Sequence, residues 1–116
     1  MALGITGVDE GIFNDLMDGD EELYKSIVSS FVDKTPATLA KLAAVSAETL
    51  ADYAKTVHAL KGACANVCAE EARKMAYSLE QKSKAGDLAG VLAENAPFLK
   101  YVEELIVRLQ DWLKKH

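Results

Sequence analysis

The sequence is poor in cysteine and has no long run of apolar residues. Its two cysteines, Cys64 and Cys68, are too few for a disulfide framework, and their spacing is typical of small core residues on a helix. No apolar run approaches the roughly 20 residues that a membrane span needs, and no signal-peptide pattern opens the sequence as given. We therefore expect cytoplasmic residence.

The sequence also lacks excess positive charge and any strand-like pattern. A net charge of −5 argues against a nucleic-acid backbone as the main partner and leaves proteins and small ligands open. No stretch alternates apolar and polar residues as a half-buried strand does, whereas the helical period recurs almost throughout. The 116 residues, half of them apolar, suffice for one domain with a real core.

The helical pattern divides into several amphipathic segments. Asp9 is the predicted N-cap of a short helix ending near Met17, and Asp20 that of the next helix. Pro36 is predicted to kink or end that second helix, and Pro97 to do the same to the last one. The predicted stripe residues of these two long helices are Leu23, Ile27 and Phe31 in one and Leu92, Leu99, Val102, Ile106, Leu109 and Leu113 in the other.

A third long helix is predicted to start after Ser46 as its cap, with Glu48 in its first turn. Residues 66–68 form a predicted turn, and further helices follow from Glu70 to Gly86 and from Asp87 to about Lys115. These elements predict an all-α fold, an antiparallel four-helix bundle with a short extra N-terminal helix. One domain covers residues 1–116, and residues 1–7 are the one candidate for disorder.

The third helix carries the residues that suggest chemistry. His58 is followed by Lys61 and Gly62, three and four positions on, so all three share one helical face. With Val57 at the centre of the apolar stripe, a turn of about 100° per residue puts His58 at its edge. Glycine in mid-helix costs about 0.5–1 kcal/mol relative to alanine, which indicates a requirement other than stability. We predict an exposed imidazole with clearance above it and a cation beside it.

An isolated histidine at the edge of an apolar stripe usually has a structural role, and this is the alternative to a chemical role for His58. His58 could also be imagined with Cys64 and Cys68 as a metal site. Cys64 lies on the core stripe, well away from His58, so we expect no metal ligands here.

The segment resembles the phosphoacceptor motif of histidine-containing phosphotransfer (Hpt) domains. In that motif the histidine is followed by any residue, an aliphatic residue, lysine, glycine and small residues, and Leu60, Lys61 and Gly62 match. The resemblance extends along nearly the whole chain. Its other elements are residues 19–23 at a helix start, Phe31 and Pro36, and Leu79 and Glu80 followed by Lys84, Gly86 and Asp87. Cys68 departs from the pattern, because the family usually has a glycine ten positions after the histidine.

The resemblance implies that His58 accepts a phosphoryl group in a two-component phosphorelay and passes it between receiver-domain aspartates. It implies that Lys61 is the cation on the phosphate side and that Gly62 gives clearance. Glu80 stands where the family has a polar residue that bonds the imidazole, and Lys84 at a position that is often basic.

The implied partners are response-regulator receiver domains and a sensor or hybrid histidine kinase, which would tether the chain if it were part of a membrane kinase. We expect no nucleic-acid partner, no direct membrane contact and a monomer. We expect no cofactor, since Mg²⁺ belongs to the partner receiver. We also expect no autonomous kinase activity. Two alternatives stay open: a non-catalytic helical module that docks receivers or kinases, and the phosphoacceptor domain of a chemotaxis-type kinase.

Overall fold

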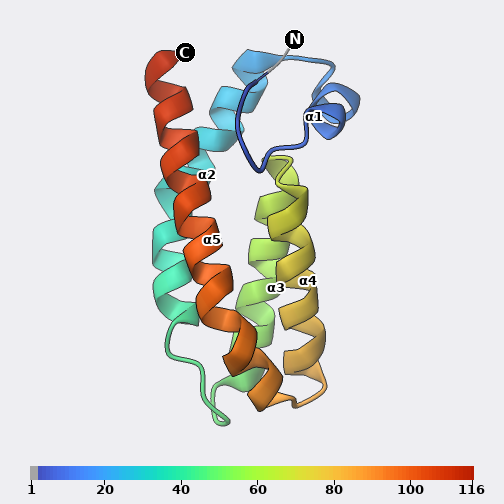
Figure 1. Ribbon diagram of the computed structural model, residues 1–116, viewed down its shortest axis with the longest axis vertical. Helices are drawn as coiled ribbons and strands as arrows, with labels where there is room; N and C mark the ends of the chain where they lie inside the picture. The colour runs from blue at the N-terminus through green and yellow to red at the C-terminus, as the bar shows by residue number, and fades with distance from the viewer. Residues whose placement is uncertain (1–2) are drawn as a thin grey trace.

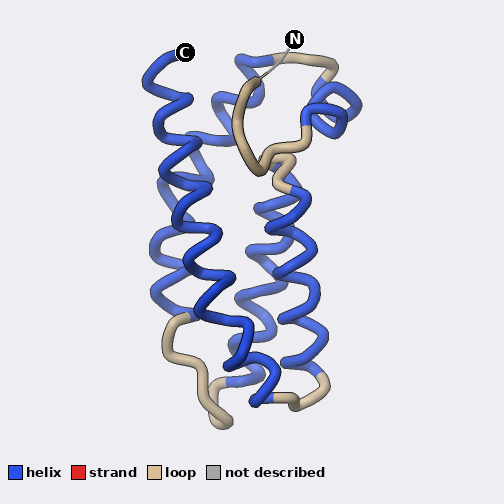
Figure 2. Tube along the Cα trace, in the orientation of Figure 1, coloured by secondary structure: helices blue, strands red, loops and turns tan. Residues whose placement is uncertain are grey.

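Helices make up all of the regular structure in the computed structural model, which describes residues 3–116 (Figures 1 and 2). Within that range there are five helices and no strand, which confirms the all-α prediction. The helices are α1 (Glu10–Met17), α2 (Glu21–Leu42), α3 (Leu50–Asn66), α4 (Glu70–Lys84) and α5 (Leu88–Lys115).

The four long helices form a closed bundle. Each packs against the next along the chain, from α2 to α5, and α5 returns to pack against α2. Short loops reverse the chain direction between them, and α1 lies at the end of the bundle where α3 turns into α4 (Figure 1). No helix in residues 3–116 combines the length and the apolar character needed to cross a membrane.

The starts of α1 and α2 agree with the sequence prediction because an aspartate caps each one. The side chain of Asp9 accepts a hydrogen bond from the backbone N–H of Ile12 at 3.1 Å. Asp20 accepts from the N–H of Leu23, also at 3.1 Å. These caps satisfy donors that the first turn of a helix leaves unpaired, so local sequence alone determines them.

The start predicted for α3 is wrong. Its cap residue is Thr49, not Ser46, and Glu48 precedes the helix instead of lying in its first turn. The backbone N–H of Ser46 donates to Oγ1 of Thr49 at 2.8 Å, so the two hydroxyl residues form a turn with each other. This side-chain to backbone bond competes with helix initiation.

The two prolines are tolerated inside helices. Pro36 lies within α2 and Pro97 within α5, and both helices continue for several residues beyond them. The sequence predicts either a kink or a helix end at each proline, and neither helix ends there. The helical segments before and after each proline both pack in the bundle, and this packing outweighs the backbone hydrogen bond that the proline removes.

Packing shifts the buried faces of α2 and α5 relative to the predicted stripes. Leu23 and Leu92 are 46% and 54% exposed, whereas their neighbours Tyr24 and Val91 are fully buried. Tyr24 lies in edge-to-face contact with the rings of Phe13 and Trp112, at centroid distances of 5.2 and 5.4 Å. The large aromatic side chain therefore takes the core position.

Residues 3–7 are attached to the bundle, contrary to the expectation of disorder. Leu3 and Ile5 are buried in the core, and Nε of Arg108 on α5 donates to the carbonyl of Thr6 at 2.8 Å. Residues 1–2 of the predicted segment lie outside the described residues.

The turn between α3 and α4 contains the residue that departs from the Hpt pattern. Cys68 is buried and has φ 61°, the left-handed conformation that glycine adopts without cost. Its carbonyl accepts the N–H of Asp9 at 2.8 Å, and the carbonyl of Val67 accepts the hydroxyl of Tyr24 at 2.6 Å. These two bonds hold the backbone in the turn in spite of the side chain.

Candidate functional site

His58 projects from α3 beside α4, and its side chain is 63% exposed. The stripe residues Val57, Leu60 and Cys64 are buried in the core, which leaves the imidazole at the edge as the helical angle predicts. A Cβ added to Gly62 would meet nothing within 4 Å. An incoming group can therefore reach the imidazole across the glycine.

A buried carboxylate holds one nitrogen of this imidazole. Nδ1 of His58 lies 2.7 Å from Oε2 of Glu80, whose side chain is 1% exposed. An ionised carboxylate only accepts hydrogen bonds, so Nδ1 must carry the proton. The lone pair of the neutral ring is then on Nε2.

Two lysines keep Glu80 ionised. Nζ of Lys61 lies 2.7 Å from Oε1. The two atoms form a close ion pair, but their angles do not meet the geometry of a hydrogen bond. Nζ of Lys84 lies 2.8 Å from Oε2, the oxygen that also bonds the imidazole. Lys61 first, then Lys84, and with them His58, lower the pKa of Glu80 to about 2 even though burial opposes the shift.

The two lysines differ in their freedom to move. Lys61 is 23% exposed, and its Nζ also lies 5.4 Å from the centroid of the Tyr77 ring. Lys84 is 57% exposed at the C-terminal end of α4. Sequence reasoning missed Tyr77; the available signal was its position three residues before Glu80, on the same face of the predicted helix.

The charges of the site favour an anion. With a neutral imidazole, the single negative charge of Glu80 faces the two positive charges of Lys61 and Lys84. The site thus has an excess of one positive charge in a chain whose net charge is −5. An anionic group on Nε2 would bring its negative charge to a site whose own charge is positive.

The two cysteines lie apart from this chemistry. Both are free and buried. Burial raises the pKa of Cys64 to about 12, and burial together with the charge of Asp9 raises that of Cys68 to about 11. Both therefore remain thiols at neutral pH, the form that neither attacks nor binds metal well. Residues 3–116 contain no group of three or more His, Cys, Asp or Glu side chains arranged to hold a metal ion.

A family model described as the Hpt domain matches residues 26–113, which include all of α3, α4 and the site. The chain belongs to the Hpt domain family. Membership implies involvement in the phosphotransfer of two-component phosphorelays, with receiver domains and kinases as the class of partner. Comparisons with curated proteins and with solved structures gave no match.

All five residues that the sequence singled out converge in this Hpt domain. His58, Lys61 and Gly62 come from α3, and Glu80 and Lys84 from α4. The placement adds one relationship that the motif does not contain: both lysines contact the carboxylate that holds the imidazole.

Proposed function

We propose that this Hpt domain carries a phosphoryl group on Nε2 of His58 and relays it between aspartates of receiver domains. The observation that supports this most is the pairing of Nδ1 with a buried, ionised carboxylate while the imidazole stays 63% exposed. The hydrogen bond to one ring nitrogen sets the tautomer, and the exposed ring can then present the lone pair of Nε2 to a partner.

The reaction needs only what His58 and a phosphorylated receiver supply. The Nε2 lone pair attacks the phosphorus of the aspartyl phosphate, and the bond from phosphorus to the aspartate oxygen breaks. The aspartate leaves with that electron pair as a carboxylate. The ring gains positive charge while Nδ1 keeps its proton, and Glu80 at 2.7 Å stabilises that charge. Transfer to a second receiver reverses these steps.

In this proposal Lys84, and not Lys61 as the resemblance implies, is the cation that serves the phosphoryl group. The phosphoryl group brings up to about two negative charges to a site with an excess of one positive charge. Lys84 is the more exposed of the two and can move from Glu80 towards the phosphoryl group. Lys61 can then stay on Oε1 and keep the buried carboxylate neutralised. The metal ion and the remaining catalytic groups come from the receiver.

Loading the chain from a receiver tests the proposal. A receiver domain labelled with ³²P on its aspartate is mixed with the chain, and the label on the chain is followed with time and after acid or alkali treatment. We expect an acid-labile, alkali-stable label that His58→Gln abolishes. The only other histidine is His116, so His116→Gln is the matched control and should load normally.

Two outcomes would reject relay through His58. Label that survives in His58→Gln places the phosphoryl group elsewhere. Stable receiver binding with no transfer over long incubation favours the docking module instead.

A further inference from the structure

Tyr77 adds an aromatic ring to the ion pairs of the site. It lies on α4 three residues before Glu80, so the two side chains share one face of the helix. Nζ of Lys61 lies 5.4 Å from the centroid of the ring, within the roughly 6 Å over which the face of an aromatic ring attracts a cation. The ammonium group of Lys61 therefore has two contacts on α4, the ring and the Glu80 carboxylate at 2.7 Å.

Two lysines share the Glu80 carboxylate. Nζ of Lys61 lies 2.7 Å from one oxygen, and Nζ of Lys84 lies 2.8 Å from the other. No other lysine or arginine in residues 3–116 pairs with Glu80. Because the two contacts are nearly equal in length, a small additional interaction decides which lysine stays on Glu80 when an anion attracts both.

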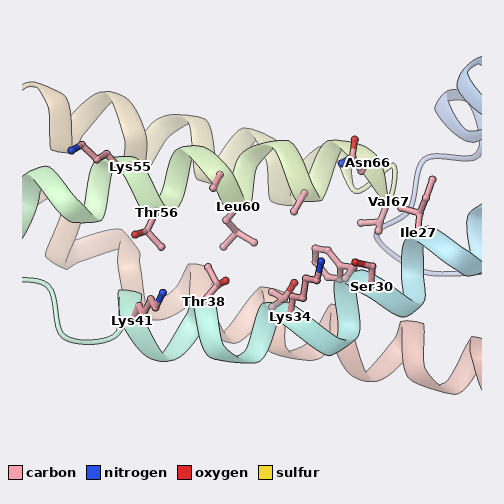
Figure 3. Close-up of a pocket in the computed structure, with 14 residues that line it drawn as sticks. Ile27, Ser30, Lys34, Thr38, Lys41, Lys55, Thr56, Leu60, Asn66 and Val67 are labelled. Atoms are coloured by element: carbon pink, nitrogen blue, oxygen red, sulfur yellow. The ribbon is translucent and has the colours of Figure 1, made fainter.

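The lysines of α2 do not enter this choice. Lys34 and Lys41 rise from α2 at the α2–α3 groove, a hollow of about 560 Å³ that Thr56 and Leu60 line from α3 (Figure 3). Helices α2 and α4 each pack against α3 and α5, so they lie diagonally across the bundle from each other. The cation on Glu80 is therefore chosen between Lys61 and Lys84.

The ring favours Lys61 by a modest factor. Attraction between a cation and a ring at an exposed site corresponds to about two- to fivefold in an equilibrium constant. This range applies because Tyr77 is half exposed and the side chain of Lys61 is 23% exposed. Lys84 is 57% exposed and has no ring beneath its ammonium group among the described residues. The ring thus shifts a nearly balanced pair towards retention of Lys61.

We propose that Tyr77 is a positioning residue whose ring retains Lys61 on Glu80, so that Lys84 is the lysine that moves to the phosphoryl group. The inference rests on the proposed function, because it assigns the cations around a phosphorylated His58. Without the ring, Lys61 leaves Glu80 more often and shares the phosphoryl group with Lys84.

NMR of the chemically phosphorylated chain tests this assignment without a receiver. The chain carries lysine labelled with ¹³C and the substitution His116→Gln, which removes the only other histidine. Phosphoramidate loads His58: Nε2 attacks phosphorus, the bond from phosphorus to the amide nitrogen breaks, and ammonia leaves. We expect the Cε resonance of Lys84 to shift on loading and that of Lys61 to stay nearly unchanged. In Tyr77→Leu both should shift, whereas Tyr77→Phe keeps the ring and should behave as the original chain does.

The same spectra before loading test the contact itself. The ring current should move the Cε protons of Lys61 upfield in the original chain and in Tyr77→Phe, but not in Tyr77→Leu. Unfolding midpoints check that the variants fold, and Tyr77→Gln replaces Tyr77→Leu if it does not. Identical Lys61 resonances in all variants, or a shift of Lys61 in place of Lys84 when the original chain is loaded, would overturn the proposal.

Transfer rates at saturating receiver separate a positioning role from a structural one. Lys84→Met should slow transfer, and adding Tyr77→Leu should raise that slowed rate by about two- to fivefold, because the released Lys61 takes over. Loss of a merely structural residue would lower the rate further. A chain that loads chemically with the expected lysine shifts but takes nothing from a receiver would reject the relay and leave the role of Tyr77 standing. Normal transfer with lysine resonances that ignore Tyr77 would reject the role of Tyr77 alone.

Discussion

Nδ1 of His58 and Oε2 of Glu80 lie 2.7 Å apart, although 22 positions separate the residues in the sequence. The packing of α3 against α4 creates this contact, and it fixes which ring nitrogen faces a partner. Because Glu80 also contacts both lysines of the site, one buried carboxylate organises the tautomer and the charge around the imidazole.

Changing Glu80 should slow transfer without abolishing it. Glu80→Ala removes the group that orients the ring, and we expect a loss of about 10–100-fold in the transfer rate, the range found for residues that orient a metal-bound imidazole. The side-chain oxygen of Glu80→Gln can still accept a hydrogen bond from Nδ1–H but lacks the charge, so the loss in transfer rate should be smaller. Rapid-quench measurements at saturating receiver give both rates. Equal, unaltered rates in both variants would show that the contact has no part in transfer.

The stability contributed by Glu80 should depend on pH in the acidic range. Its pKa is about 2 in the folded chain against an ordinary value of 4.5, so the unfolded chain takes up the proton first as pH falls. The stabilisation is complete above about pH 5 and is lost as the pH falls towards 2. Urea unfolding should show the difference in stability between the original chain and Glu80→Gln narrowing by roughly 2 kcal/mol from pH 6 to pH 3.

The variant serves as the reference because the other carboxylates titrate in both proteins. A difference that stays constant between pH 6 and pH 3 would contradict the depressed pKa.

Substitutions of Gly62 should affect the stability of the chain and its transfer rate differently. Because a Cβ there meets nothing within 4 Å, Gly62→Ala should stabilise the chain by about 0.5–1 kcal/mol. Gly62→Met should be similarly stable, but its long side chain stands over the route to His58 and should reduce transfer by about tenfold or more. Unfolding midpoints and transfer rates for the two variants check this. Full activity in Gly62→Met would show that transfer does not need free space at position 62.

Cys68 should tolerate glycine better than alanine. Its φ of 61° costs a residue with a Cβ about 1–2 kcal/mol, and glycine avoids that cost. We expect Cys68→Gly to be more stable than Cys68→Ala by about 1 kcal/mol, even though alanine keeps more buried surface. Denaturant unfolding of the two variants decides the order, and a more stable alanine variant would show that packing outweighs the conformational strain.

Features that depend on neighbouring residues in the sequence could be predicted. The caps at Asp9 and Asp20 arise within one helical turn, and the exposure of His58 follows from its angle to Val57. The prediction that Ser46 caps α3 fails because Ser46 and Thr49 lie in the same turn and either could be the cap. Only the folded loop shows that the cap is Thr49.

Features that depend on which helices meet could not be predicted from the sequence alone. The motif identifies Lys61, but its pairing with Glu80 and its position near Tyr77 require the register of α3 against α4. Leu23 has the period of a core residue, yet Tyr24 is buried because its ring fits between Phe13 and Trp112. The α2–α3 groove likewise exists only once α2 and α3 are side by side.

The ring nitrogen that carries the phosphoryl group can be identified by NMR. The chain is labelled with ¹⁵N in its histidines, loaded from a phosphorylated receiver, and studied by ¹⁵N and ³¹P NMR under alkaline conditions. We predict a single phosphorus–nitrogen coupling, to Nε2 of His58, with His116 unchanged. A coupling to Nδ1, a coupling at His116, or no phosphorus–nitrogen bond in a chain that carries phosphate would contradict it.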